Sequence, residues 1–376
     1  MQSKGREAGL SLVELMVALA IGAFLVLGAV SIFVGNRSAS DLETSLARLQ
    51  ENGRFALDLM TEDILNSQYL GCNTGDVMLY NMADDPNLPT FANRLEGVFA
   101  YEKLGDGSWK TKPAMPAQMT AGTSSIADSA RNMTDALSVR SSRSLGNAQL
   151  TAKILPGATE LRLDSNPDCR IETGSRMVVT GCQLTAHMFE VPVAPSCTPA
   201  TAGNPVTLSL AGSGVNAITS FNTSYGDDDV SDGDDGADVL ITKRVFWFVA
   251  DTGRQYRNVP VYALFREVNG QREEMIEGVE NMQIMFGQRI AGTDNLRYVR
   301  PADSDLNANL DNYDGLNTVR IALLVQSYDS VKSMHNPDDK TYRLLNADIG
   351  PADHTSGNVL REVFTTTVLL RNAPEV

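Results

Sequence analysis

The feature that most constrains this chain is an uninterrupted apolar run near its N-terminus. Residues 10–34 are almost wholly apolar and follow a short polar segment, residues 1–9, which carries Lys4 and Arg6. At about 1.5 Å of rise per residue, a helix of this length spans a hydrocarbon layer roughly 30 Å thick. The basic residues favour a cytoplasmic N-terminus. No small-residue cleavage site follows Val34, so the run differs from an ordinary signal peptide and should stay in the mature protein.

One ionisable residue, Glu14, lies inside this apolar run, five residues after Gly9. A carboxylate in a membrane helix costs roughly 2.5–3.5 kcal/mol on insertion scales, so such residues usually have a partner and a function. The plain alternative is a signal anchor with a Glu residue at the membrane interface.

Residues 9–14, Gly-Leu-Ser-Leu-Val-Glu, resemble the type III signal of type IV pilins and type II secretion pseudopilins. The resemblance implies that a prepilin peptidase cuts between Gly9 and Leu10 and methylates the new amine of Leu10. Glu14 then lies one helical turn from that amine and can neutralise it, or a neighbour's, inside an apolar filament core. Ser31 stands where major pilins usually carry a proline, which favours a minor subunit.

The helix should continue beyond the apolar run. Apolar residues recur at steps of three and four, with Gly53 on the same stripe, while charged residues that include Asp63 fill the remaining positions. No proline interrupts the chain from Leu10 to Leu70, so we predict one helix of roughly 55 to 60 residues that ends at Gly71. The stripe consists of Leu42, Leu46, Leu49, Ala56, Leu57, Met60 and Ile64.

The rest of the chain reads as mostly β-structure. Short connections between the expected strands favour an antiparallel sheet, and therefore an α+β, pilin-like fold in which the long helix packs on that sheet. We expect a leader peptide at 1–9, a transmembrane and filament-core helix at 10–34, its amphipathic continuation at 35–71, and a β-rich globular domain at 72–376. The expected strands are 135–139, 153–163, 176–180, 239–249, 260–267, 282–286, 319–325 and 363–369.

The chain has four cysteines, and no two of them form a C-x-x-C pair. They are Cys72, Cys169, Cys182 and Cys197. An even number after an export-type N-terminus suggests one or two disulfides in an oxidising compartment, with four buried free thiols as the alternative. Cys169 and Cys182 bracket a strand-like run and a glycine turn, so we expect these two to pair.

Binding and catalytic signals are weak. The net charge is −15 and basic residues are scattered, which argues against nucleic-acid binding. Residues 303–314 place oxygen ligands at calcium-loop spacing, but Ala308 stands where such a loop needs glycine, so a solvated loop is favoured. No catalytic motif or cofactor-binding glycine loop is present, and we expect neither an enzyme nor a cofactor. The calcium candidates are Asp303, Asp305, Asn307, Asp311 and Asp314.

Several segments resemble PilW-type minor pilins. They are LQENGRFALDLM at 49–60, YLGC at 69–72, IEGVENMQIMFG at 276–287, NTVRIALLVQS at 317–327 and REVFTTTVLLRN at 361–372. The resemblance implies an inner-membrane precursor with a periplasmic globular domain. It also implies a role in priming type IV pilus assembly near the pilus tip.

The implied partners are the prepilin peptidase, other minor pilins and the major pilin, often with a large tip adhesin. A type II secretion pseudopilin of the large J kind is the first alternative. A signal-anchored periplasmic enzyme or binding protein is the second.

Overall fold

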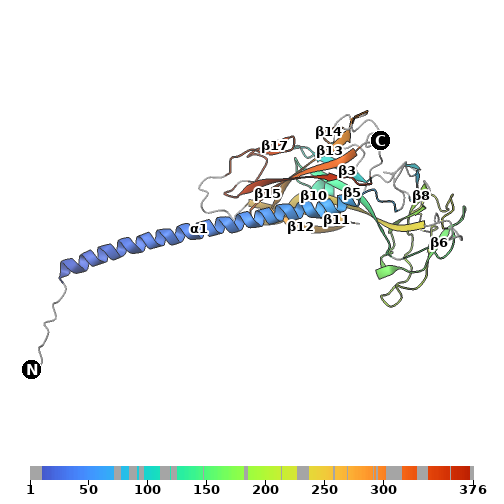
Figure 1. Ribbon diagram of the computed structural model, residues 1–376, viewed down its shortest axis with the longest axis horizontal. Coiled ribbons are helices and arrows are strands. Elements are labelled where there is room, and N and C mark those ends of the chain that lie inside the picture. Colours follow the sequence, from blue (N-terminus) through green and yellow to red (C-terminus); the bar gives the residue numbers. More distant parts are fainter. Residues whose placement is uncertain are drawn as a thin grey trace, which may run out of the picture.

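A single long helix, α1 (Leu12–Leu65), projects from a β-rich globular part (Figure 1). The computed structural model describes residues 11–71, 78–83, 91–92, 97–110, 119, 125–146, 148–181, 185–212, 214–226, 237–256, 259–268, 270–290, 292–293, 295–301, 316–327, 338–355 and 357–372. The 54 residues of α1 correspond to about 81 Å at 1.5 Å per residue. This arrangement confirms the predicted α+β class.

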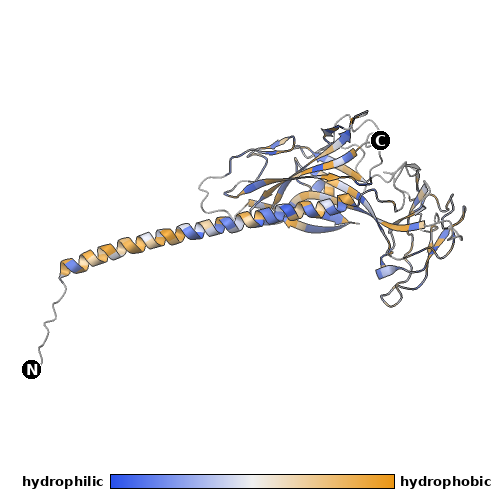
Figure 2. Ribbon diagram, in the orientation of Figure 1, coloured by the Kyte–Doolittle hydropathy of each residue, from blue (hydrophilic) through white to orange (hydrophobic). Residues whose placement is uncertain are grey.

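The two halves of α1 have different surroundings. No residue from 12 to 44 is buried, whereas the second half buries one side against the sheets. Figure 2 shows the first half as predominantly hydrophobic and the second as mixed. Leu46, predicted to lie on the buried stripe, remains 37% exposed, next to Ser45, the first buried residue of the helix. The buried residues are Ser45, Leu49, Gly53, Ala56, Leu57, Met60, Asp63 and Ile64.

The predicted end of the helix at Gly71 is wrong. Helix α1 ends at Leu65, and Asn66 is its C-cap. The chain leaves the helix early because Gln68 donates its backbone N–H to the carbonyl of Arg140, and Ser67 bridges to Ser141. Pairing with a strand therefore replaces the last helical turn that the sequence pattern predicted.

The larger sheet has ten strands in the order β2-β1-β8-β7-β10-β5-β3-β4, with β11 and β12 added beside the second half of β10. Neighbouring pairs are antiparallel except for β1 and β8, which are parallel and depart from the predicted arrangement. The bounds are β1 (Met78–Asn81), β2 (Phe91–Ala92), β3 (Val98–Lys103), β4 (Trp109–Lys110), β5 (Asp135–Ser144), β7 (Arg176–Gly181), β8 (Thr185–Glu190), β10 (Ala237–Tyr256), β11 (Val259–Val268) and β12 (Gln271–Glu277).

A second, four-stranded antiparallel sheet has the order β14-β13-β15-β18. Its strands are β13 (Val279–Arg289), β14 (Leu296–Val299), β15 (Leu316–Gln326) and β18 (Arg361–Leu369). A hairpin of β16 (Tyr342–Leu344) and β17 (Ala347–Ile349) packs on one face of this sheet through Ala322 and Leu324. The opposite face joins α1 and the larger sheet in the main hydrophobic core.

A distal lobe, residues 145–226, lies beyond the C-terminal end of α1 (Figure 1). It contains a separate apolar cluster, the short strand pair β6 (Glu160–Leu163) and β9 (Val206–Ser209), and strands β7 and β8 of the larger sheet. Strand β10 connects this lobe to the body, because its first part pairs with β7 and its later part with β11. The strand predicted at 153–163 is confirmed only for its last four residues.

Asp63 attaches α1 to the larger sheet. Its side chain is 8% exposed and accepts hydrogen bonds from three residues of β10 and β11. Arg266 donates through Nε (3.0 Å) and Nη2 (3.2 Å), Lys243 through Nζ (3.0 Å), and Trp247 through Nε1 (3.1 Å). The sequence pattern placed Asp63 on the polar side of the helix, and that prediction is wrong.

Gly53 is a point of close approach between α1 and β18. The ring of Phe364 lies where a Cβ atom on residue 53 would be. The residue is buried, so glycine is needed here for space rather than for backbone freedom. Phe364 can therefore cover the helix directly and close this side of the core.

We expect Gly53→Ala to destabilise the protein by about 1–3 kcal/mol, because the added methyl overpacks against Phe364. The better helix propensity of alanine, about 1 kcal/mol, is the smaller effect. The control Gly35→Ala should not lower stability, because nothing lies within 4 Å of that position. Adding Phe364→Leu should recover part of the loss. Urea unfolding followed by tryptophan fluorescence measures all three variants, and equal effects of the two alanines would contradict this explanation.

Candidate assembly site

The start of α1 is organised by a reciprocal capping box between Ser11 and Glu14. The backbone N–H of Ser11 donates to Oε2 of Glu14 (2.9 Å), and the backbone N–H of Glu14 donates to Oγ of Ser11 (3.2 Å). These two bonds satisfy N–H groups that an α-helix leaves free at its N-terminus. They also turn the Glu14 carboxylate back toward the N-cap residue Ser11, which is next to Leu10 in the sequence.

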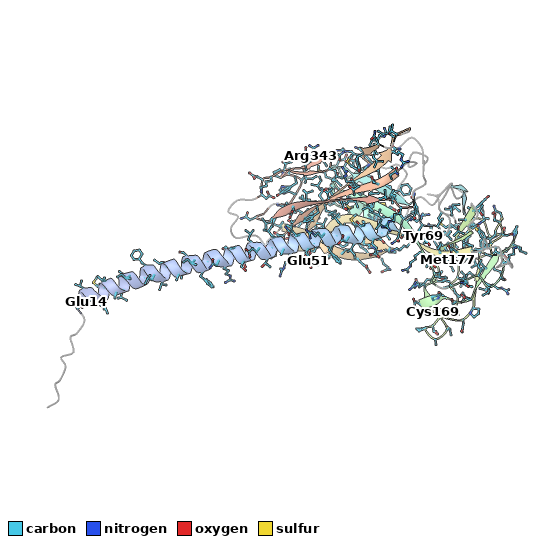
Figure 3. All side chains as sticks on the ribbon, viewed as in Figure 1. Glu14, Glu51, Tyr69, Cys169, Met177 and Arg343 are labelled. Carbon is cyan, nitrogen blue, oxygen red and sulfur yellow. A yellow bond between two sulfur atoms is a disulfide. The ribbon has the colours of Figure 1, made fainter. Side chains whose placement is uncertain are left out.

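Glu14 lies at the far end of α1 from the globular part (Figure 3). The helix around it exposes large apolar side chains, with Leu12 74% and Phe24 77% exposed. One 18-residue window of α1 has a mean hydropathy of 2.7, and its length and composition are sufficient to cross a membrane. Such a surface requires lipid or other apolar helices around it, and Glu14 brings a carboxylate into that environment.

The remaining predicted site residues are only partly covered by the described structure. Gly9 and Leu10, the expected cleavage pair, lie outside the described residues. So do all five calcium candidates, Asp303, Asp305, Asn307, Asp311 and Asp314. Within the part of the chain that the structure describes, no group of three His, Cys, Asp or Glu residues could hold a metal ion.

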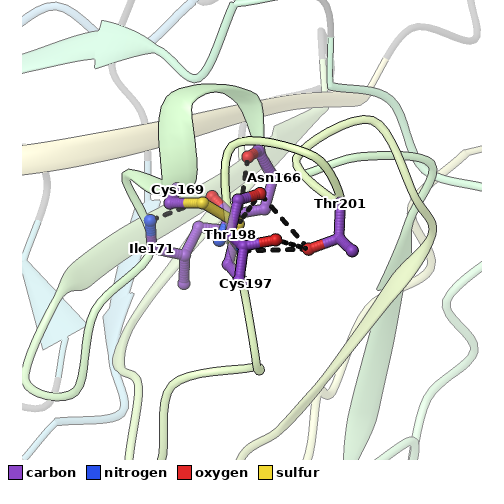
Figure 4. Close-up of a disulfide and its surroundings, with 6 residues drawn as sticks. All are labelled: Asn166, Cys169, Ile171, Cys197, Thr198 and Thr201. Atoms are coloured by element: carbon purple, nitrogen blue, oxygen red, sulfur yellow. Dashed lines mark hydrogen bonds between the residues drawn. A yellow bond between two sulfur atoms is a disulfide. The ribbon is translucent and has the colours of Figure 1, made fainter.

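The structure contains a disulfide between Cys169 and Cys197, with a Cα–Cα distance of 5.6 Å (Figure 4). The predicted pairing of Cys169 with Cys182 is therefore wrong. Strand β7 separates the two positions by about 20 Å of extended chain. Cys169 instead lies beside Asn166, whose backbone N–H donates to Ala202 of the Cys197 loop. Cys72 and Cys182 lie outside the described residues.

The sequence analysis missed a buried ionic network at the start of β18. Arg361 donates through Nε to Glu280 (2.6 Å) and through Nη1 to Asp338 (2.9 Å), and the Arg361 and Glu280 side chains are 0% exposed. Burial alone would lower the pKa of Arg361, but the carboxylates of Glu280 and Asp338 outweigh it and raise that pKa. An arginine at a strand boundary gives no sequence signal of burial, because most arginines are exposed.

His187 is a buried residue of β8, inside the distal lobe. Its Nδ1 lies 2.5 Å from the hydroxyl of Tyr225, and its ring stacks on Tyr80 at a centroid distance of 4.8 Å. Burial lowers the pKa of His187 to about 4, from an ordinary value of 6.5. The neutral imidazole packs between Tyr80 of β1 and Tyr225, so His187 is a packing residue of the lobe.

We expect this histidine to make the protein less stable in acid. The unfolded chain binds the proton more tightly than the folded one, so the contribution is complete above about pH 6.5 and is lost as the pH falls toward 4. The slope approaches about 1.4 kcal/mol per pH unit. Urea unfolding at pH 7 and pH 5 should show a smaller pH dependence for His187→Phe. The control Tyr225→Phe, which keeps the imidazole, should retain the pH dependence; an unchanged slope in His187→Phe would contradict the assignment.

Two family models match the chain, and their positions agree with the structure. The prokaryotic N-terminal methylation motif matches residues 4–30, which include the capping box and much of the uncovered helix. The type IV pilus-assembly protein W family, PilW, matches residues 248–372, from the later part of β10 through β18. Comparisons with curated proteins and with solved structures found no match.

The methylation motif at the start of a long apolar helix, followed by an α+β globular part, is the arrangement expected of a type IV pilin-like subunit. The PilW match over residues 248–372 is consistent with a PilW-type minor pilin, which is the family that the sequence resemblance predicted. The segment matched by the PilW model contains β11, β12 and all four strands of the second sheet. The distal lobe lies outside both matches.

Proposed function

We propose that this protein primes assembly of a type IV pilus and stays at or near the pilus tip together with other minor pilins. It is made as an inner-membrane precursor with its globular part in the periplasm. A prepilin peptidase cuts it between Gly9 and Leu10, and the amine of Leu10 is methylated. The other minor pilins and the major pilin are its partners, and the protein has a structural rather than a catalytic role.

The observation that carries this proposal is the Ser11–Glu14 capping box at the start of an otherwise uncovered apolar helix. Cleavage after Gly9 would leave a cationic amine one residue before Ser11. The Glu14 carboxylate already points toward that end of the helix. When the helix moves from lipid into a bundle of apolar helices, the amine and carboxylate can neutralise one another, whereas either charge alone would be expensive to bury.

The shape of the globular part supports a position at the end of the filament. The distal lobe extends past the C-terminal end of α1 along the direction of the helix (Figure 1). In a filament built around a bundle of parallel helices, that space lies above the subunit, where the next globular part would otherwise sit. A subunit with such a lobe is best accommodated when few or no subunits follow it.

We expect Glu14→Ala to leave membrane insertion intact and to reduce pilus assembly. Insertion depends on apolarity, and the substitution removes a charge that costs roughly 2.5–3.5 kcal/mol in lipid. Docking should weaken because the Leu10 amine then lacks its carboxylate in the helix bundle. The control is Glu43→Ala, which removes an exposed carboxylate from the polar part of the same helix.

Three measurements test this prediction. Mass spectrometry should find the mature chain beginning at methylated Leu10 in both variants, and membrane fractionation should be unchanged. Co-purified pilus subunits and surface pili should fall for Glu14→Ala only. Wild-type piliation in that variant would show that Glu14 is merely an interfacial residue. Gold-labelled antibody against the distal lobe should mark pilus ends, and labelling along the shaft would contradict the tip location.

A further inference from the structure

Strand β18 has an edge that no other strand of the described structure covers. It pairs with β15 over residues 361–369 without a register shift and is the last strand of its sheet. The backbone N–H of Leu370 donates to the carbonyl of Asn317, and the backbone N–H of Ser327 donates to the carbonyl of Leu360. The even-numbered residues of β18 therefore direct their backbone N–H and C=O groups toward β15. In an antiparallel ladder, the backbone N–H and C=O groups of the odd-numbered residues of β18 then point away from β15. Among the described residues, no backbone hydrogen bond satisfies the N–H of Val363, Thr365, Thr367 or Leu369.

The other edges are short or charged. Strands β2 and β4 have two residues each, and β14 has four. Strand β12 has seven, but it carries Arg272, Glu273, Glu274 and Glu277. Charged residues, short length, bulges and proline are the usual means by which proteins protect an edge strand from pairing. The nine residues of β18 have no proline and no bulge; exposed Glu362 lies near one end, and its central part consists of Thr365, Thr366 and Thr367.

We propose that the outer edge of β18 is a docking site for an extended strand of another pilus subunit, which adds to the four-stranded sheet in the antiparallel direction. This inference rests on the proposed function for the kind of partner. Main-chain hydrogen bonds to the odd-numbered residues would supply affinity, as they do wherever a peptide extends a sheet.

Charges at the two ends of the strand define the chemistry of the partner. Exposed Glu362 lies near the beginning of β18, and exposed Arg371 follows its end. An antiparallel partner strand should therefore carry a cationic residue opposite Glu362 and an anionic residue opposite Arg371. Between them it should carry small or β-branched side chains, which fit beside the exposed Thr365 and Thr367.

A second copy of this chain fits less well. Strand β18 runs alongside α1 in the same direction, because Phe364 packs on Gly53 and Asn372 donates to the carbonyl of Ser67. Antiparallel pairing of two β18 strands would point the two helices in opposite directions. Helices inserted into one membrane with the same orientation cannot satisfy that arrangement. Two copies would also bring together two chains with a net charge of −15 each.

The test uses the full-length chain expressed with its native pilus components. Thr365→Pro removes an outward N–H and places a ring at the edge, but it leaves the pairing with β15 intact. The matched control Thr365→Val keeps the N–H and is compatible with a strand. Thr366→Pro removes an N–H directed at β15 and serves as the control for loss of folding in the same assays.

A photoreactive amino acid at Thr367 identifies the contacting chain and peptide by mass spectrometry. We expect a crosslink to an extended segment of another pilus subunit. Thr365→Pro should reduce it about tenfold, the effect expected for leaving one buried backbone group unpaired, while Thr365→Val retains it. Membrane-fraction levels should be the same for both variants.

Equal crosslinking in both variants would overturn the proposal, as would a crosslink only to a second copy of the chain or no crosslink at all. A failure of the proposed function would give a different result. The wild-type chain would then co-purify with no pilus subunit, whatever the crosslinking at β18 shows.

Discussion

A buried carboxylate of α1, Asp63, joins the helix to the larger sheet in addition to the apolar core that they share. Asp63 accepts hydrogen bonds from Lys243 and Trp247 of β10 and from Arg266 of β11, so a single side chain fixes the helix relative to the larger sheet. The guanidinium of Arg266 also lies over the ring of Trp247, 5.7 Å from its centroid. Removing the cations would be costly because the Asp63 side chain, only 8% exposed, would remain as a buried charge. The position of the helix in turn decides where the second sheet can pack, since Phe364 must meet Gly53.

A second buried ionic network organises the other sheet. Arg361, Glu280 and Asp338 come from β18, β13 and the segment before β16, and Thr355 also binds Glu280 through its backbone N–H (3.0 Å). Arg131 connects this region to the larger sheet by donating to the carbonyls of Glu280 (2.7 Å) and Asp353 (2.8 Å). The two sheets are therefore joined by hydrogen-bonded charges as well as by the shared apolar core.

Much of this architecture could be predicted from the sequence, because long periodic segments give strong local signals. The apolar run, the amphipathic helix and the later strands appear where their patterns placed them. The features that could not be predicted depend on distant residues. Asp63 looks like an ordinary polar-face residue until Arg266 is folded against it, and Gly53 looks like a weak helix position until Phe364 packs on it. The pairing of Cys169 depends on a loop that returns 28 residues later, which spacing alone does not reveal.

The length of β10 has a mechanical consequence. This strand of 20 residues is shared by the distal lobe and the body. Near its middle, Lys243 and Trp247 donate hydrogen bonds to Asp63 of the helix. A pull applied to the lobe and resisted by the helix would run along β10 rather than across it. The ladders with β5, β7 and β11 would then be loaded in shear, with many hydrogen bonds sharing the force at once. Tension between the lobe and the helix would therefore be carried by β10 and the strands that pair with it.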